Sequence, residues 1–328
     1  FQRTANYTVP ARNTPLDPEF VARIKADYPA FRARNSLQIN AFGSNMPRSS
    51  IPAREFSPAV RRAALEERWE YGGLFFLGAF GDLLLDKAAN DEAAEFVREK
   101  IRSVVKDREV ARLLSPGQII GCKRLCVDTD YYATFNRPNV RLVDIAEHGI
   151  DGITPEGVVA NGESFALDAL VFATGFDAMT GTLLRIDIRG RHGQTLRHAW
   201  RAGPRTYLGL SVAGFPNLFL ITGPGSPSVL TNMIVSIEQH VNWIAGCIAH
   251  LGKSGRTTIE AQPAAQEAWV EHVNAVADRT LYPMCNSWYV GANIPGKTRV
   301  FMPLLGFPPY VEKCDEVAAK GYEGFLLA

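Results

Sequence analysis

The chain has 328 residues, of which 46% are hydrophobic and 21% charged, and its formal net charge at pH 7 is +1. This composition predicts a globular protein with two or three packed units and excludes a largely disordered chain. Because the charge is near neutral and no block of Lys and Arg occurs, we expect neither a nucleic-acid nor a membrane partner, although a local basic pocket could hold one phosphate group.

Two further features bear on the kind of protein. The most apolar window, residues 74–85, contains Asp82 and is too short to cross a bilayer, so we expect it in a core or an interface. The five cysteines are scattered and odd in number, which favours a reducing compartment and predicts a cytoplasmic protein. The pair Cys122 and Cys126 lacks the further ligands of a zinc site, so no metal is expected.

The chain opens with FQRTANYTVP, which is typical of the end of a strand, and we therefore expect the later part of a longer protein. From about Thr14 to Pro116 the pattern is helical. Helix starts, where a side-chain oxygen can accept from free amides, are expected at Asp17-Pro18, Ser57-Pro58 and Asp91. One apolar helix face is expected to comprise Phe96, Val97, Ile101, Val104 and Val105.

From Gly121 the period changes to that of strands. A strand is expected over residues 140–143, and a hairpin is expected around Asn161-Gly162, a pair that supplies positive φ at both turn positions. The apolar run Leu170–Ala173 then ends abruptly in Thr174-Gly175-Phe176-Asp177. This pattern is typical of a buried strand that stops at the ligand crevice of an α/β sheet.

A second buried strand is expected over residues 218–222, followed by the Gly- and Pro-rich loop 223–228 and a helix over residues 232–251. The apolar stripe of this helix comprises Ile234, Ile237, Val241, Ile244, Ile248 and Leu251. Residues 282–307 are rich in Pro, Gly and Asn and predict an ordered but mobile loop. Residues 314–320 predict a last short helix.

Five short motifs follow one another in the chain: Arg3-Thr4, Lys123-Arg124, ATGFD at 173–177, GPGSPS at 223–228 and Ser287-Trp288-Tyr289. In this order, and with intervening text such as GPRTYLGLSVAGFPNLF and SIEQHV, the chain resembles the Baeyer-Villiger monooxygenases over nearly its whole length. These are class B flavoprotein monooxygenases of the phenylacetone and cyclohexanone monooxygenase type. The G-x-G-x-x-G loops of that family are missing, so the resemblance implies a carboxy-terminal portion without the first FAD- and NADP-binding glycine loops.

The resemblance implies an α/β fold, namely a Rossmann-like flavoprotein with two dinucleotide-binding domains and a helical insertion, incomplete at the amino terminus. Residues 1–13 would end the first segment of the NADP-binding domain, and 14–118 would form the insertion. Residues 119–175 would complete the NADP-binding domain, and 176–328 would form the carboxy-terminal part of the FAD-binding domain.

Arg3, Thr4 and Lys123 would lie together if the first strand and the strand after the insertion are neighbours in one sheet. Two cations and a hydroxyl suit a phosphate, and an Arg near the ribose favours NADP(H) over NAD(H). The alternative is two solvated cations and a strand threonine. The resemblance places these residues at the family's 2′-phosphate contacts.

Arg124 is the expected catalytic residue and also a cofactor contact, because oxygen insertion into a ketone needs a permanent cation beside the flavin. The alternative is an arginine at a strand end that pairs with Asp128 or Asp130.

In the loop 223–228 the glycines and prolines would let backbone amides approach a ligand. The resemblance implies that Met233 contacts FAD and that Trp288 closes over the nicotinamide cofactor. The implied substrate pocket consists of Ser228, Val229, Leu230 and Thr231. The alternatives are a helix-packing methionine and a loop-anchoring tryptophan. His240 is expected to be a packing residue.

The resemblance implies an enzyme that uses NADPH, FAD and O₂ to insert one oxygen atom into a small-molecule ketone, giving an ester or lactone through a C4a-peroxyflavin. We expect the isolated chain to bind FAD poorly and to be inactive, because it lacks a Gly-rich βαβ unit for the pyrophosphate. One alternative is a flavin monooxygenase that oxidises nitrogen or sulfur. Another is a non-catalytic remnant, or a subunit completed by a separate amino-terminal chain.

Overall fold

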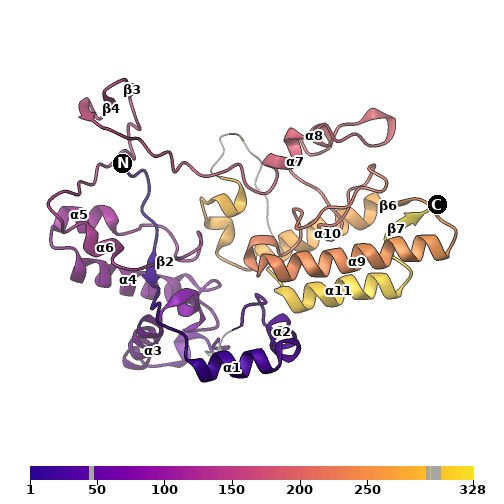
Figure 1. Cartoon of the computed structure of the whole chain (residues 1–328), viewed down its shortest axis with the longest axis horizontal. Helices are drawn as coiled ribbons and strands as arrows, with labels where there is room; N and C mark the ends of the chain where they lie inside the picture. Colours follow the sequence, from indigo (N-terminus) through magenta and orange to yellow (C-terminus); the bar gives the residue numbers. More distant parts are fainter. Residues whose placement is uncertain (44–47, 293–295, 297–303) are drawn as a thin grey trace. The chain divides into compact units, whose positions relative to one another are not determined.

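The computed structural model describes residues 1–43, 48–292, 296 and 304–328, and it consists of two compact units (Figure 1). The first unit is Phe1–Thr14 with Met46–Gly175, and the second is Pro15–Asn45 with Phe176–Ala328. The helical stretch predicted over residues 14–118 is therefore divided. Residues 15–45 belong to the second unit, and the rest of the stretch belongs to the first.

The first unit contains most of the predicted helical stretch. Its helical segments are η1 (Ala53–Glu55), α3 (Pro58–Tyr71), η2 (Gly73–Gly78), α4 (Lys87–Val104), α5 (Arg108–Leu114) and α6 (Tyr131–Thr134). Ser57 caps α3 as predicted, since its side chain accepts from the Val60 amide. The predicted start at Asp91 is wrong because α4 begins one turn earlier, where Asp86 accepts from the Ala89 amide.

The core of the first unit forms around one face of α4. Phe96, Val97 and Ile101 are buried as predicted, and so is Val105 just after the helix. Val104 is 41% exposed, so its placement on this face was wrong. The apolar window 74–85 contributes Phe76, Phe80 and Leu83 to the same core, which confirms its predicted burial.

Two small sheets complete the first unit. In the first, β1 (Thr8–Pro10) pairs in parallel with β2 (Cys126–Asp128). In the second, β3 (Gly152–Thr154), β4 (Gly157–Ala160) and β5 (Glu163–Ala166) form an antiparallel meander. The predicted Asn161-Gly162 turn joins β4 to β5, with φ of 53° and 72°. No strand forms over residues 140–143, and the next residue, Asp144, forms only an isolated parallel bridge with Gln2.

The two predicted buried strands are not strands in this structure. Val171, Phe172 and Phe176 are 85%, 65% and 89% exposed. Within the described residues no strand pairs with 170–173, and a strand forms only against a hydrogen-bonding neighbour. Residues 218–222 run as a loop in which the Leu220 amide donates to the carbonyl of Leu210 at 2.8 Å.

The second unit is mainly helical. Its helical segments are α1 (Pro18–Ala26), α2 (Tyr28–Ser36), α7 (Gly181–Arg185), η3 (Arg191–Gly193), α8 (Leu196–Ala199), η4 (Ser228–Leu230), α9 (Met233–Lys253), α10 (Pro263–Ala277), η5 (Tyr282–Met284), η6 (Trp288–Val290) and α11 (Phe307–Ala319). Strands β6 (Ile259–Ala261) and β7 (Phe325–Leu327) pair antiparallel. The last helix begins at Phe307 and not at the predicted position 314, because Pro308 and Pro309 fit its first turn.

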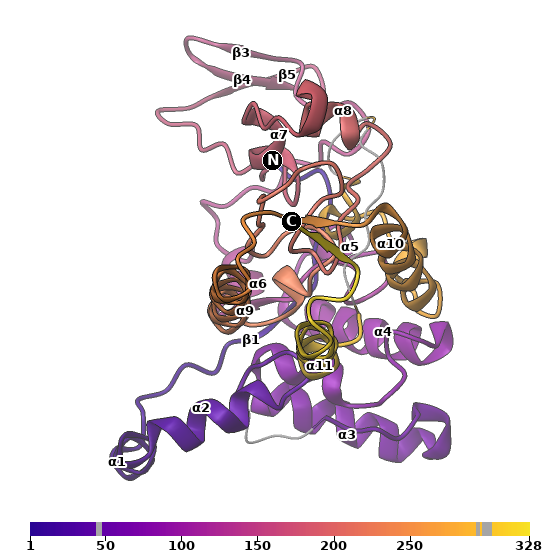
Figure 2. The same ribbon diagram turned by 90° about the vertical axis from the view of Figure 1, so that its right-hand side faces the viewer.

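Helix α9 packs along α11, and Figure 2 shows both helices end-on. The predicted helix is confirmed, with Asn232 as its cap. Its buried residues are Ser236, His240, Trp243, Cys247 and Leu251. The predicted stripe is buried only in part. Leu251 is buried and Ile244 packs against the core, but Ile234, Val241 and Ile248 are 65%, 44% and 56% exposed.

The segment 15–45 supports the starts of both helices. The carbonyl of Asn40 accepts from the Asn232 amide at 2.8 Å, and the carbonyl of Ile39 accepts from the Phe307 amide at 2.7 Å. Free amides at a helix start need such acceptors. No helix in the described ranges combines the length and the apolarity that a bilayer span requires.

We predict that Asn90→Leu destabilises the first unit by about 3 kcal/mol or more, because several buried polar groups would lose their partners. Asn90 is fully buried and donates to the carbonyls of Leu83 at 2.7 Å and Ile120 at 2.9 Å, while its own oxygen accepts from the Ile120 amide. Urea unfolding measures the effect. The exposed Asn139→Leu is the matched control, and equal midpoints for both variants would contradict the prediction.

Candidate functional site

The parallel pair of β1 and β2 places the residues before both strands beside one cavity of about 920 Å³. Arg3, Thr4 and Lys123 all line this cavity, so the predicted neighbourhood of the three residues is confirmed. The other lining residues are Phe1, Gln2, Asn6, Thr8, Cys126, Val127, Asp128, Tyr131, Phe135, Arg141, Leu142, Ile145, Ile150, Leu170, Val171, Phe172, Ala173 and Thr174. The cavity therefore combines a cationic edge with apolar walls.

The two cations at this edge influence each other. Burial lowers the pKa of Lys123, and the positive charge of Arg3 lowers it further. Among the described residues, neither Arg3 nor Lys123 forms an ion pair. A bound anion would relieve the repulsion between them. The donor set therefore fits a phosphate group, for which Arg and Lys are common ligands.

The other charged groups of the cavity are already engaged. Arg141 forms two hydrogen bonds of 2.7 Å with Glu163. The Asp128 carboxylate accepts from the Thr8 hydroxyl and, at 3.0 Å, from the Tyr131 amide. Sequence reasoning missed the bond between Thr8 and Asp128, because it depends on the pairing of β1 with β2, in which Thr8 lies opposite Cys126, two residues before Asp128.

Arg124 follows Lys123 and is exposed. It is not among the lining residues of the 920 Å³ cavity. Its backbone is fixed, because the Asn6 side chain donates to its carbonyl oxygen at 3.1 Å. The structure thus places the predicted catalytic arginine at a held backbone position with a solvent-facing side chain.

The Gly-rich loop 223–228 packs against its own unit. A Cβ on Gly223 would come within 2.4 Å of the Gly209 carbonyl oxygen, and one on Gly225 within 2.7 Å of the Thr206 hydroxyl. The Thr206 hydroxyl donates to the Pro224 carbonyl at 2.6 Å, and the Trp269 indole donates to the Gly225 carbonyl at 2.9 Å. These glycines are needed for close packing of the chain on itself, a role that the sequence analysis did not foresee.

Three of the four predicted substrate-pocket residues form η4, and the fourth, Thr231, follows it directly. Ser228 and Thr231 are buried, and the Thr231 hydroxyl donates to the Ser228 carbonyl at 3.0 Å. The Ser236 hydroxyl, 2.6 Å away, therefore donates to Thr231. Val229 and Leu230 are half-buried. The accessible surface of this segment is thus mainly apolar.

The two remaining predicted cofactor residues also lie in the second unit. Met233 is the first residue of α9 and is half-buried. Trp288 opens η6, is half-buried, and has its ring centroid 4.3 Å from that of Tyr289. Arg3, Thr4, Lys123 and Arg124, in contrast, belong to the first unit.

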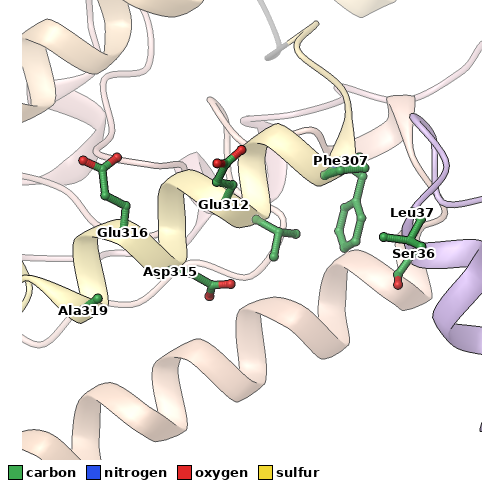
Figure 3. A pocket seen from close by; sticks show the side chains of 9 residues that line it. Ser36, Leu37, Phe307, Glu312, Asp315, Glu316 and Ala319 are labelled. Atoms are coloured by element: carbon green, nitrogen blue, oxygen red, sulfur yellow. The ribbon is translucent and has the colours of Figure 1, made fainter.

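A hollow of about 590 Å³ lies between the end of α2 and α11 in the second unit. Figure 3 shows Phe307 beside Ser36 and Leu37, with the carboxylates of Glu312, Asp315 and Glu316 spaced along α11. Three carboxylates repel phosphate groups. This hollow does not suit a dinucleotide, in contrast to the cavity beside β1 and β2.

No family model matches the chain. The Baeyer-Villiger monooxygenase of Pseudooceanicola batsensis is 39% identical over 99% of this chain and 60% of its own length. The phenazine N-monooxygenase PhzNO1 of Lysobacter antibioticus is 38% identical over 100% of this chain and 60% of its own length. The solved OTEMO complex with FAD and NADP is 38% identical, with a TM-score of 0.94, over 100% of this chain and 61% of its own.

The chain thus spans about 60% of the length of the curated relatives that it matches. The likeness to the OTEMO structure confirms the predicted α/β flavoprotein fold class. The similarity in sequence and the similarity in structure both extend over practically every residue of this chain. The chain is thus similar to the Baeyer-Villiger monooxygenase of Pseudooceanicola batsensis in sequence and to the OTEMO structure in fold.

Proposed function

We propose that the chain is part of an FAD- and NADPH-dependent Baeyer-Villiger monooxygenase that inserts one oxygen atom of O₂ into a small-molecule ketone, giving an ester or lactone. The observation that carries this proposal is the coincidence of two findings. The chain matches such an enzyme over 99% of its residues. It also contains a cavity whose paired cations suit the phosphate of a nicotinamide cofactor.

Arg3, Thr4 and Lys123 would hold the 2′-phosphate that distinguishes NADP(H) from NAD(H). A guanidinium and an ammonium provide charge-assisted hydrogen bonds, and the Thr4 hydroxyl provides one more donor. The lowered pKa of Lys123 supports this role, because the phosphate would supply the negative charge that the site lacks. Trp288, with its flat indole, is proposed as a further contact for this cofactor.

FAD, when bound, supplies the oxygen-activating chemistry, and NADPH supplies the hydride. We assign Met233 and the loop 223–228 to contact with the flavin. The segment of Ser228, Val229, Leu230 and Thr231 is assigned to the substrate pocket. The Thr231 hydroxyl is bonded to the Ser228 carbonyl and to the Ser236 hydroxyl, while Val229 and Leu230 are only half-buried. The apolar side chains of Val229 and Leu230 suit an uncharged ketone.

Arg124 is assigned the catalytic role. Its guanidinium keeps its charge at any working pH, so it can stabilise the negative oxygen that develops when the ketone carbonyl is attacked. The bond from Asn6 to its backbone carbonyl holds its Cα in place. Arg124 is an exposed residue, so its guanidinium is accessible to a ligand.

The exposed apolar run around Val171, Phe172 and Phe176 supports completion of the site by further polypeptide, since exposed apolar patches mark interaction surfaces. The sequence has no G-x-G-x-x-G loop for the FAD pyrophosphate. We therefore infer that the isolated chain binds FAD weakly and is inactive. The completing segment could be covalently continuous or a separate amino-terminal chain.

A second candidate function is flavin-dependent oxidation of nitrogen or sulfur. It is favoured by the 38% identity to the phenazine N-monooxygenase over the whole chain. Product analysis with a ketone, a thioether and an aromatic N-heterocycle separates the two candidates. An ester or lactone supports the first, and an N-oxide or sulfoxide without any ester supports the second.

Arg3→Ala and Lys123→Ala are each predicted to weaken NADPH binding by about ten- to a hundredfold, because each removes a charge-assisted bond to phosphate. NADH binding is expected to change little. Isothermal titration of the full chain with both cofactors measures this difference. Arg112→Ala is the control, since this exposed arginine of the first unit pairs with Glu109. Equal losses of NADPH and NADH affinity would count against a 2′-phosphate site.

Arg3→Ala is also predicted to raise the pKa of Lys123, because it removes the second cause of its lowering. NADPH is expected to raise this pKa as well, by supplying negative charge. It follows that NADPH affinity falls with increasing pH as Lys123 loses its proton, and that this fall begins below the ordinary lysine range. NMR titration of labelled lysine side chains reads the pKa directly. An unchanged Lys123 pKa in the variant would refute the coupling.

The proposed activity is tested by purifying the chain and then supplying the amino-terminal segment of a relative. The chain alone is expected to be colourless, and the completed protein is expected to bind flavin and to oxidise NADPH with a ketone. Arg124→Ala should then lower the rate about a hundred- to a thousandfold. The exposed Arg137→Ala serves as control. A stoichiometric flavin in the isolated chain would show that the completing segment is not required.

A further inference from the structure

A chain of hydrogen bonds runs through the core of the second unit. His240 is fully buried in α9, and its Nδ1 accepts from the Thr222 amide at 2.9 Å. Its Nε2 lies 3.0 Å from the Tyr310 hydroxyl. Because Nδ1 accepts, the ring proton of the neutral form is on Nε2 and is donated to Tyr310. The Tyr310 hydroxyl in turn donates to the Leu208 carbonyl at 2.8 Å.

The residues at both ends of this series of hydrogen bonds have an unusual backbone conformation. Thr222 has φ of 53° and Leu208 has φ of 57°. Side chains other than Gly, and β-branched ones above all, rarely adopt this region. Such conformations persist only where the surroundings impose them. His240 and Tyr310 bond directly to these two residues and so help to impose them.

Leu208 and Thr222 each lie in a loop, and these two loops pack closely against each other. Leu208 precedes Gly209, where a Cβ would come within 2.4 Å of the Ser226 amide nitrogen. Thr222 precedes Gly223, where a Cβ would come within 2.4 Å of the Gly209 carbonyl oxygen. The hydrogen-bond chain therefore fixes the two loops at the point of their closest approach.

We propose that His240 is a positioning residue, which, together with Tyr310, sets the conformation of the loop 223–228 for contact with the flavin. The identity of the ligand rests on the function proposed above. A neutral imidazole is required, because a proton on Nδ1 would leave the Thr222 amide without its acceptor. Burial lowers the pKa of His240 to about 4, so the neutral form is the one present at physiological pH.

The packing role expected for His240 from the sequence is thus only part of its contribution. Its aromatic ring does pack against Tyr310, at 5.7 Å between centroids. An apolar side chain of similar size would fill the same space without the desolvation cost of an imidazole. What an apolar side chain would not supply is the acceptor for Thr222 and the link to Leu208.

Three variants separate these contributions. His240→Asn keeps a polar atom near the position of Nδ1 and removes the link to Tyr310. Tyr310→Phe keeps the ring and the Thr222 contact and removes the bond to Leu208. His240→Phe removes both contacts while retaining an aromatic ring. His250→Asn is the matched control, because this histidine lies on the same helix and packs on Tyr322 away from the two loops.

Amide hydrogen exchange of the full chain is the first measurement. In His240→Phe we expect the amides of Thr222 and of the loop 223–228 to exchange about tenfold faster, which is the effect of one lost hydrogen bond of typical strength. His240→Asn should have a smaller effect at Thr222. Nitrogen-15 NMR of the unsubstituted protein should show His240 as the neutral tautomer with the proton on Nε2.

The second measurement is cofactor affinity in the protein completed with an amino-terminal segment. His240→Phe is expected to weaken FAD binding about tenfold and to leave NADPH binding unchanged, a split that general loss of stability would not produce. Unchanged exchange at Thr222, or a uniform increase over the whole second unit, would overturn the inference. So would faster loop exchange with unaltered FAD affinity.

Absence of any FAD binding in the unsubstituted completed protein would instead overturn the proposed function. In that case the exchange data still decide whether His240 holds the loop.

Discussion

Parallel pairing of β1 with β2 is the constraint on which the cationic cavity depends. Two segments more than a hundred residues apart are brought together by three residues of each strand. Tyr7, the residue before β1, supports this pairing. Its buried hydroxyl donates to the Gln118 carbonyl at 2.7 Å and accepts from Arg98 at 2.8 Å. A short ladder is thus supported by side-chain bonds to the chain that leads into β2. Without it, Arg3 and Lys123 would be unrelated surface cations.

Local chemistry made much of the fold predictable from sequence. The caps Asp17 and Ser57, together with the Asn161-Gly162 turn, depend on neighbours a few residues away, and each occurs as expected. The proximity of Arg3 and Lys123 also followed, because only one strand pairing was needed to produce it. The helix start predicted at Asp91 is wrong because Asp86, five residues earlier, has the same side chain and caps the helix instead.

Features that depend on distant partners could not be read in this way. Leu170–Ala173 has the composition of a strand, but strand formation requires a neighbour that no local pattern reveals. Helix α9 has apolar side chains on more than one face, and only its contacts with α11 select the buried one. The roles of Thr8, Tyr131 and Tyr310 likewise arise from pairings between remote segments. For the site, the sequence identified residues of suitable chemical type, and the structure showed which residues surround each of them.

The membership of residues 15–45 in the second unit makes both units discontinuous in the polypeptide. Expression of 176–328 alone would remove the Ile39 and Asn40 carbonyls that accept from the first amides of α11 and of the cap of α9. The first unit also cannot be excised as a single stretch, because it consists of residues 1–14 and 46–175. Separating the two units therefore requires a circular permutation or a linker that joins residue 14 to residue 46. A simple truncation would remove part of each unit.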